Sequence, residues 1–347
     1  MNDDKVYTAI GMMSGTSLDG IDMALIETDG KDYTKLQDFE TLPYQDEVRR
    51  VIRAALGARH ANETTYKAEK LVTQAHIEAI KSFGHVADVI GFHGQTIMHD
   101  PAQRFTWQIG DAQRLADEVD MDVVADMRMA DIAAGGQGAP LLPLCHRAFA
   151  SVFDKPIAIL NLGGVGNITW LGQKRHDILA FDTGPANALI DDLVKEKTDQ
   201  PYDSEGALAS AGQVHQNMVD DWIEHAYFSK AVPKSLDRDE WQVRRAYDLP
   251  LEDAVATLAA FTVQAVAKSF QYLPQMPKTV YVAGGGRHNK YLMAELSKAL
   301  SCAVEPVEKL GWNGDALEAQ GFAYLAVRSL KGLALTCLLY TSDAADE

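Results

Sequence analysis

The chain has 347 residues, and 47% of them are hydrophobic, which is enough for two domains because a single core usually stops growing at about 250–300 residues. Its 49 acidic and 32 basic residues give a formal net charge of −17, which disfavours nucleic acid and other polyanions as partners. The three cysteines form no CxxC pair, so the sequence offers no zinc or dithiol motif and is typical of a reducing compartment.

The amino terminus argues against export. It is acidic, and glycine interrupts its apolar stretch, unlike a signal peptide. No run in the chain approaches the ~20 apolar residues of a membrane span. We therefore expect a soluble cytoplasmic protein that contacts neither nucleic acid nor membrane.

The first part of the chain alternates predicted strands with helices. A glycine-rich turn at residues 14–20 joins the first two strands, which makes a hairpin. An amphipathic helix then ends near Phe83. The predicted strands of this part are residues 6–12, 21–27, 86–92, 105–109 and 121–125.

A loop of small residues at 134–140 marks the expected domain boundary, which we place near residue 130. Beyond it, a strand, a glycine turn and a returning strand repeat the opening hairpin. The recurrence predicts two duplicated α/β domains, residues 1–130 and 131–330, around an interdomain cleft, followed by a tail at 331–347. The later elements are expected at 156–160, 168–171, 178–181 and 279–283 as strands, at 185–194, 251–273, 289–300 and 315–330 as helices, and at 195–212 as a loop.

The turn from Gly11 to Asp22 is dense in glycine and hydroxyl residues, so backbone N–H and side-chain O–H donors can converge on phosphate oxygens. An ordinary hairpin turn is the competing interpretation. Two acidic side chains beside a phosphate favour a hydrated Mg²⁺ between them or a proton-transfer role. The candidate nucleotide-binding residues here are Gly15, Thr16, Ser17, Leu18, Asp19, Gly20, Ile21 and Asp22.

Two further glycine turns each follow a predicted strand. Gly163 and Gly164 lie in one, which is either a second phosphate cradle or a tight hairpin. Gly284, Gly285 and Gly286 follow a buried strand and precede a helix, where α/β sheets usually accept a nucleotide. Three such turns together favour ATP binding.

Several polar side chains follow strands and could carry chemistry. Asp182 ends the strand at 178–181 and is either a general base or the cap of a helix that starts at Pro185. Arg128 and Asp131 follow another strand, where a guanidinium could bind a substrate carboxylate or simply belong to a solvated charge run. The remaining candidates are His93, Gln95 and Glu318, each with a structural alternative.

Six segments, taken together, resemble the anhydro-N-acetylmuramic acid kinase family, and they occur in the family's order from about residue 8 to residue 332. They are GMMSGTSLDGID, GFHGQT, DMRMADIAAGGQGAPL, NLGGVGNIT, FDTGPAN and VAGGGRHN. The resemblance implies the fold of the actin, Hsp70 and hexokinase superfamily, with duplicated RNase H-like domains. It also implies a reaction in peptidoglycan recycling, in which ATP, water and 1,6-anhydro-N-acetylmuramic acid give N-acetylmuramic acid 6-phosphate and ADP.

The resemblance assigns roles as well. Asp182 is implied to deprotonate the water that opens the sugar, the first glycine turn to hold the ATP phosphates with Mg²⁺, and Gly284–Gly286 to lie against the adenosine. Arg128 is implied to bind the lactyl carboxylate or to orient the sugar, and Glu318 matches an acidic family position near the sugar. His93, Gln95 and Asp131 are further candidate substrate contacts. The small sugar is the expected partner, and a homodimer stays open.

The chain departs from the family pattern in two places. Leu236 and Asp237 stand where the family has Thr-Gly after Pro-Lys-Ser, and the chain from Leu333 onward lacks the family's usual ending, as a truncated or foreign carboxyl terminus would. Two other functions also remain open at this point. They are a kinase of the same superfamily for another sugar or an acyl group, and an ATP-driven conformational module.

Overall fold

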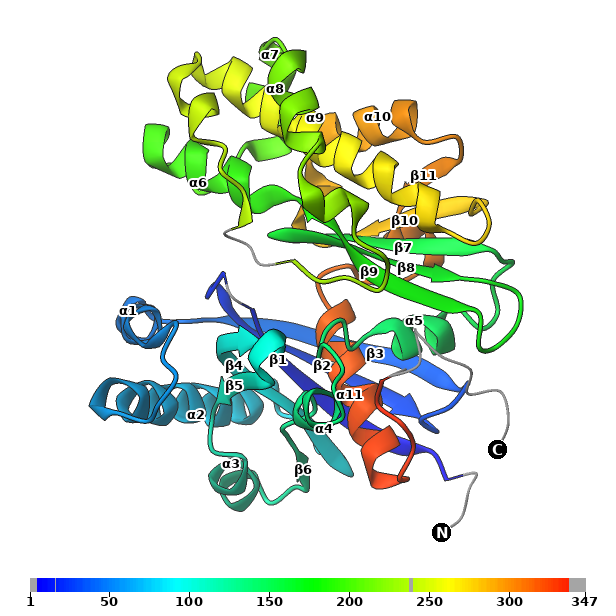
Figure 1. Cartoon of the computed structure of the whole chain (residues 1–347). Helices are drawn as coiled ribbons and strands as arrows, with labels where there is room; N and C mark the ends of the chain where they lie inside the picture. Colours follow the sequence, from blue (N-terminus) through cyan, green and yellow to red (C-terminus); the bar gives the residue numbers. More distant parts are fainter. Residues whose placement is uncertain (1–4, 16, 237–239, 337–347) are drawn as a thin grey trace. The chain divides into compact units, whose positions relative to one another are not determined.

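The computed structural model describes residues 5–15, 17–236 and 240–336 (Figure 1). Thr16, Asp237 and the last eleven positions of the tail, which begin at Cys337, therefore lie outside the described residues. The backbone divides into two compact units. Unit 1 is Met1–Val152 with Ala316–Glu347, and unit 2 is Phe153–Asp315.

This division differs from the boundaries expected at residues 130 and 330. The segment between residue 131 and Val152 stays with unit 1, and the last helix returns to unit 1 as well. The return has a packing cause, because that helix covers three strands of the first sheet, β1 (Tyr7–Ser14), β2 (Gly20–Thr28) and β4 (Val89–Asp100). A chain that crosses twice between its units cannot be divided by one sequence boundary.

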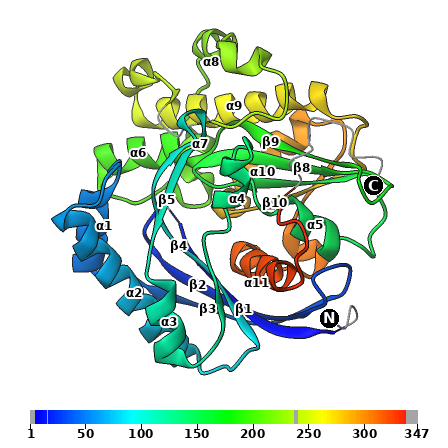
Figure 2. The same cartoon turned by 60° about the horizontal axis from the view of Figure 1, so that its bottom comes forward.

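Unit 1 contains one mixed sheet with helices on both faces. Figure 2 shows α1, α2 and α3 on one side of the sheet and α11 on the other. The elements are β1 (Tyr7–Ser14), β2 (Gly20–Thr28), β3 (Thr34–Pro43), α1 (Asp46–Ala55), α2 (Glu63–Phe83), β4 (Val89–Asp100), β5 (Phe105–Ile109), α3 (Ala112–Val119), β6 (Val123–Val124), α4 (Met129–Ala133), α5 (Pro143–Phe149) and α11 (Leu317–Leu330).

Two glycines let α11 lie directly on the backbone of the sheet. Gly11 of β1 and Gly91 of β4 are paired neighbours. A Cβ on Gly11 would come within 1.7 Å of the Ala319 carbonyl oxygen, and one on Gly91 within 2.1 Å of the Phe322 carbonyl oxygen. Any side chain at either position would push the helix away. Gly11 thus serves packing and lies outside the glycine turn at residues 14–20, which is called the phosphate turn below after the role predicted for it.

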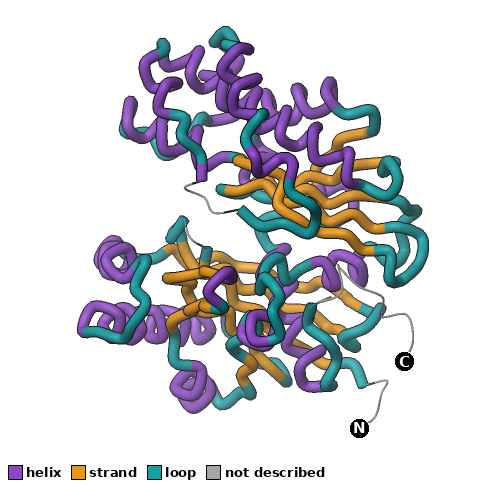
Figure 3. The backbone as a smooth tube through the Cα atoms, in the orientation of Figure 1, coloured by secondary structure: helices purple, strands orange, loops and turns teal. Residues whose placement is uncertain are grey.

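Unit 2 also contains one mixed sheet, and α6, α7, α8 and α9 form a layer along one of its faces (Figure 1 and Figure 3). The elements are β7 (Ile157–Leu162), β8 (Val165–Leu171), β9 (Ile178–Pro185), α6 (Asn187–Thr198), α7 (Ala207–Ala211), α8 (Gln216–Ile223), α9 (Leu251–Ser269), β10 (Thr279–Ala283), α10 (Lys290–Ala299) and β11 (Ala303–Pro306). The buried apolar face of α9 is the centre of this core.

The two sheets share the topology of their first four strands. Unit 1 has the order β3-β2-β1-β4-β5 with β6 also beside β4, and unit 2 has the order β9-β8-β7-β10-β11. In both, the first three strands form an antiparallel meander and the fourth joins the first in parallel. Beyond these, β5 runs antiparallel to β4, whereas β6 joins β4 in parallel as β11 joins β10. This confirms the predicted pair of duplicated α/β domains of the RNase H-like type.

Some local predictions were wrong. Pro185 is the last residue of β9 and does not open a helix, because α6 begins at Asn187. His93 and Gln95 lie inside β4, which is longer than the apolar run indicated. The expected loop at 195–212 contains α7. β3 gave no apolar signal because it is an edge strand whose residues alternate between partly and fully exposed.

Candidate active site

The phosphate turn of unit 1 is built on a buried hydrogen-bond network. β1 ends at Ser14, whose hydroxyl donates to Gln95 Oε1 at 2.5 Å and accepts from the Tyr44 hydroxyl at 2.9 Å. Gln95 Nε2 donates to the Gly15 carbonyl at 3.3 Å. Gln95 is fully buried and uses both ends of its amide on or beside the turn. The structure thus places this predicted sugar contact where it shapes the turn.

The predicted nucleotide-binding residues of this turn differ in exposure. Ser17 and Asp19 are exposed, whereas Gly15 and Asp22 are partly buried. Leu18 is buried with a φ of 61° and donates its N–H to the Gly15 carbonyl at 3.2 Å, which anchors the turn in the core. Gly20 and Ile21 are buried at the start of β2, so they fix the end of the turn in the core.

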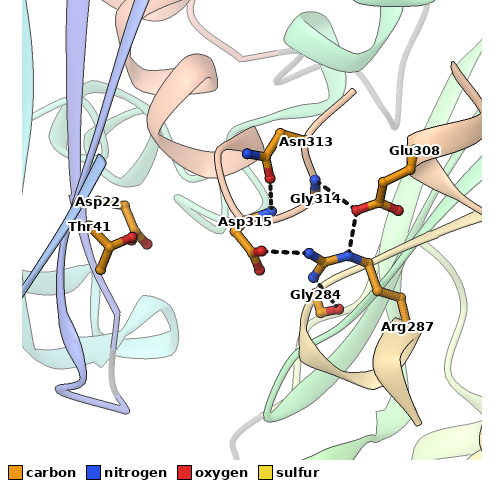
Figure 4. Close-up of polar contacts among 8 residues, drawn as sticks. All are labelled: Asp22, Thr41, Gly284, Arg287, Glu308, Asn313, Gly314 and Asp315. Atoms are coloured by element: carbon orange, nitrogen blue, oxygen red, sulfur yellow. Dashed lines mark hydrogen bonds and ion pairs between the residues drawn. The ribbon is translucent and has the colours of Figure 1, made fainter. Parts of the chain in front are cut away.

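Asp22 and Glu318 bring two carboxylates together in unit 1. The Thr41 hydroxyl donates to Asp22 Oδ1 at 2.6 Å (Figure 4). Glu318 lies in the first turn of α11 and is partly buried. Burial and then the negative charge of Asp22 raise the pKa of Glu318, while Arg128 lowers it. A cation bound near this pair would relieve the repulsion between them.

Arg128 is held by neutral acceptors. His93 Nδ1 lies 2.8 Å from the Gly94 carbonyl oxygen, which can only accept, so Nδ1 carries the hydrogen and Nε2 is an acceptor. Arg128 donates to that Nε2 through Nε at 3.2 Å and Nη2 at 3.0 Å, and to the Gly138 carbonyl through Nη1 at 2.7 Å. Burial and then the charge of Arg128 hold the pKa of His93 well below its usual range, consistent with this neutral ring.

Asp131 organises the loop that holds Arg128. Its Oδ2 accepts the Gly138 N–H at 2.7 Å, and its Oδ1 accepts the Thr336 hydroxyl at 2.5 Å. Gly138 is therefore fixed from both sides, with Asp131 on its N–H and Arg128 on its carbonyl. Asp131 is buried, and its bond to Gly138 makes it a support for Arg128.

Asp182 lies within β9 of unit 2 and caps no helix. Its Oδ2 accepts the Leu236 N–H at 2.8 Å, its own N–H donates to the Lys234 carbonyl at 2.9 Å, and its carbonyl accepts the Tyr227 hydroxyl at 2.5 Å. Burial raises the pKa of the carboxyl group to about 7, partly offset by the Leu236 N–H. A carboxylate with a pKa near neutrality suits a general base at physiological pH.

The turn at Gly163 and Gly164 connects β7 to β8, as predicted. Its carbonyls accept three N–H groups at the start of α6. Asn187 N–H donates to the Gly163 carbonyl at 2.9 Å, and Ala186 and Ala188 N–H donate to the Gly164 carbonyl at 3.1 and 3.2 Å. The turn thus caps this helix, while Gly164 itself stays exposed.

The third glycine turn combines packing with exposure. Gly284 has a φ of 73°, and a Cβ there would lie 2.3 Å from Asn161 Oδ1. A Cβ on Gly286 would lie 2.5 Å from Leu162 Cβ, whereas Gly285 is exposed. Arg287 follows the turn and donates to the Gly284 carbonyl at 3.0 Å (Figure 4). This exposed backbone between two packed glycines can contact a ligand closely.

Comparison with known proteins identifies the family. A family model described as anhydro-N-acetylmuramic acid kinase matches residues 7–343. The chain belongs to this family. A relative of that name from Rhizorhabdus wittichii is 48% identical over 341 residues, with 94% of this chain and 93% of the relative covered. Another, from Paramagnetospirillum magneticum, is 49% identical over 339 residues, with 94% of each chain covered. The resemblance seen in the six sequence segments is thereby confirmed.

Sequence reasoning missed four residues that support the site of this anhydro-N-acetylmuramic acid kinase family member. Tyr44 holds the phosphate turn, Tyr227 and Lys234 hold Asp182, and Arg287 holds the third glycine turn. Lys234 stands in the Pro-Lys-Ser segment that the family shares, and Arg287 follows the triple glycine directly. Both residues lie inside segments that the sequence analysis used, but no role was assigned to them there. Tyr44 and Tyr227 gave no chemical signal of their own in the sequence.

The Leu236 departure from the family pattern is compatible with this geometry. The bond to Asp182 comes from the Leu236 backbone N–H, which any residue except proline provides. Asp237 lies outside the described residues. In the segments that the structure describes, none of the helices combines the length and apolar character of a membrane span.

Proposed function

We propose that this kinase family member uses ATP to open and phosphorylate 1,6-anhydro-N-acetylmuramic acid in the cytoplasm, giving N-acetylmuramic acid 6-phosphate and ADP for peptidoglycan recycling. The observation that carries the proposal is the family match over residues 7–343. A fold alone would not support it, because this class of fold serves many reactions. The geometry at Asp182 adds an independent chemical argument.

The proposed chemistry begins at Asp182. The 1,6-anhydro sugar has no free 6-hydroxyl, so the C1–O6 bond must break before O6 can accept a phosphoryl group. The Asp182 carboxylate takes a proton from water, and the water oxygen forms a bond to C1 while C1–O6 breaks. O6 then attacks the γ-phosphorus of ATP, and the bond from that phosphorus to the β,γ-bridging oxygen breaks to leave ADP. The proton held by Asp182 returns to solvent.

The sugar and ATP contacts are assigned by side-chain chemistry. Arg128 presents a guanidinium whose neutral acceptors leave its charge for an anion, which fits the lactyl carboxylate of the sugar. His93 orients that guanidinium, and Glu318 is the proposed acceptor for a sugar hydroxyl. The turn from Gly15 to Asp22 is proposed to bind the ATP phosphates together with Gly163 and Gly164. Gly285 and its neighbours are proposed to contact the adenosine.

The residues of unit 1 fit a Mg²⁺ ion. Mg²⁺ is usually held by one or two carboxylates together with substrate phosphates. Asp22 lies beside the phosphate turn and close enough to Glu318 to raise its pKa, so a cation at Asp22 would be stabilised by both charges. When bound, Mg²⁺ neutralises charge that develops on the phosphate oxygens.

The test is substrate profiling of the purified chain with ATP. We expect ADP release to depend on 1,6-anhydro-N-acetylmuramic acid and the product to carry phosphate on O6. Phosphorylation of glucose but not of the anhydro sugar would overturn the proposal in favour of another sugar kinase. Equal ATP turnover with and without sugar would overturn it in favour of an ATP-driven conformational module.

A further inference from the structure

Asp182 is held by three hydrogen bonds from the segment between Tyr227 and Leu236. Two of them fix its backbone, from the Tyr227 hydroxyl at 2.5 Å and to the Lys234 carbonyl at 2.9 Å, and one fixes its carboxylate, from the Leu236 N–H at 2.8 Å. These partners lie 45 to 54 residues further along the chain. The position of the carboxylate therefore depends on how this segment is itself fixed.

Lys234 fixes the segment from inside. Its side chain is buried, with 7% of the residue exposed, and its Nζ donates to the Tyr227 carbonyl at 3.1 Å. The same ammonium lies 4.6 Å from the ring centre of Tyr227 and 4.5 Å from that of Tyr272. Cation–π contacts of this kind strengthen when water is excluded. The ammonium group of Lys234 thus contacts two aromatic rings and one backbone carbonyl at the same time.

These bonds close a ring of three residues. The Asp182 N–H donates to the Lys234 carbonyl, Lys234 Nζ donates to the Tyr227 carbonyl, and the Tyr227 hydroxyl donates to the Asp182 carbonyl. The Leu236 N–H that reaches the carboxylate comes two residues after Lys234. A displacement of Lys234 must therefore move both Tyr227 and Leu236 relative to Asp182.

A buried lysine is costly, and its retention here calls for a reason. Burial, and then the nearby ammonium groups of Lys230 and Lys268, lower the pKa of Lys234 to about 8. In the described part of the chain, no carboxylate lies within ion-pair distance of its Nζ. An apolar side chain of similar length would fill the space without that cost, so packing alone does not explain the charge.

We infer that Lys234 is a positioning residue for Asp182, acting through Tyr227 and the backbone of Leu236. The inference rests on the proposed role of Asp182 as the base. Lys234 itself touches neither water nor sugar in this scheme. It holds the carboxylate in the orientation in which it can take the proton.

The test compares Lys234→Met with Lys268→Met. Lys268 is a matched control, because its Nζ also donates to a backbone carbonyl, that of Ile223, and lies 5.8 Å from the ring centre of Phe228, but it has no bond to Asp182 or its partners. We expect Lys234→Met to lower kcat by about tenfold or more with KM for sugar and ATP within about twofold, since only the base is displaced. Lys268→Met should stay within about twofold of the wild type in both.

The pH profile supplies a readout that a purely structural role would not move. The hydrogen bond from the Leu236 N–H lowers the pKa of Asp182. If Lys234→Met breaks this bond, the pKa should rise, and the acid limb of the plot of kcat against pH should move to higher pH. The inference would be overturned if the acid limb of Lys234→Met lay at the wild-type pH and its kcat equalled that of Lys268→Met. Absence of sugar-dependent turnover in the wild type would instead refute the proposed function.

Tyr227→Phe keeps the inference testable if Lys234→Met does not fold. This variant retains the ring and the carbonyl that contact Lys234 and removes only the hydroxyl bond to Asp182. We expect kcat to fall by several-fold to about tenfold with KM unchanged. Where both variants fold, the variant that carries both substitutions should show a smaller fold-reduction in kcat than the product of the two single reductions, because both substitutions act through one ring of bonds. A wild-type kcat in Tyr227→Phe would overturn the inference.

Discussion

The two guanidinium groups at Arg128 and Arg287 show opposite ways of holding a charge. Arg287, in unit 2, is almost fully buried and bonds to Glu308 at 2.8 Å and to Asp315 at 2.7 Å (Figure 4). Burial disfavours its charge, but the Asp315 and Glu308 carboxylates outweigh burial and raise its pKa. Arg128, in unit 1, bonds among the described residues only to His93 and a backbone carbonyl. Burial lowers its pKa to about 10, with Glu318 partly offsetting this.

The difference separates structural charges from charges available to a ligand. Two carboxylates compensate Arg287, so it links the third glycine turn to the segment from Glu308 to Asp315. Arg128 is oriented by neutral groups that leave its charge for an incoming anion. Asp182 is the acidic counterpart of Arg128, since a backbone N–H orients it and burial leaves its pKa near 7.

The largest expected effect is that of Asp182→Asn. The amide keeps the shape of the side chain but cannot accept a proton, so kcat should fall by about 10³-fold or more. ATP should still bind, as isothermal titration calorimetry can measure. Retained turnover in this variant would contradict the base assignment. Asp154→Asn, at an exposed surface carboxylate, serves as the control and should leave kcat unchanged.

Arg128→Met should have the next largest effect. Loss of a charge-assisted bond to the sugar carboxylate should raise KM for the sugar and lower kcat/KM by about 10- to 100-fold, as steady-state kinetics can measure. KM for ATP should change little. An unchanged KM for the sugar would show that Arg128, like Arg287, is structural, and would remove the contrast between them.

The pH dependence should show the raised pKa of Asp182 directly. The carboxylate must be ionised to act as a base, so kcat/KM should fall about tenfold per pH unit below about pH 7 and level off above it. An acid limb near the ordinary aspartate value of about 4 would contradict the burial argument.

Folding stability should depend on pH in the matching direction. The folded pKa of Asp182 lies above the unfolded value of 3.8, so the folded state binds its proton more tightly. The stabilisation from the protonated form is present below pH 3.8 and is lost as pH rises through about 7. The stability of Asp182→Asn relative to wild type, measured by urea unfolding, should therefore increase between pH 4 and pH 8.

The sequence predicted buried features better than exposed ones. β10 was predicted with its observed bounds, because it lies between β7 and β11 and its apolar run is nearly continuous. β5 was also predicted with its observed bounds although it ends its sheet, because aromatic and β-branched residues dominate its sequence. The edge strand β3 and the short helices α3 and α8 were not predicted, because their exposed residues give no period. The helix α5 is mostly buried but has only seven residues, too few for a helical period to show. The recurrence of the hairpin was sufficient to predict the duplication.

The site was predictable where a motif ended a strand and less so where contacts cross the chain. Asp182 was identified from its strand, but Tyr227 lies 45 residues away and shares no motif with it. Gln95 and Asp131 were interpreted as sugar contacts because polar residues after a strand often bind ligands. In the structure, their oxygens and nitrogens are used by the phosphate turn and the Gly138 loop, which spacing alone could not reveal.

Arg287→Met should have the smallest effect on catalysis and a clear effect on stability. Its removal leaves Glu308 and Asp315 facing each other, but their side chains are 45% and 58% exposed and can regain water, so we expect a loss of about 1–3 kcal/mol of unfolding free energy. KM for the sugar should stay within about twofold of the wild type. Arg244→Met, at an arginine whose side chain is 79% exposed, is the control and should cost less than about 1 kcal/mol. A large rise in the KM for sugar with normal stability would reverse the roles assigned to Arg128 and Arg287, because it would mean that a guanidinium compensated by two carboxylates still binds the substrate.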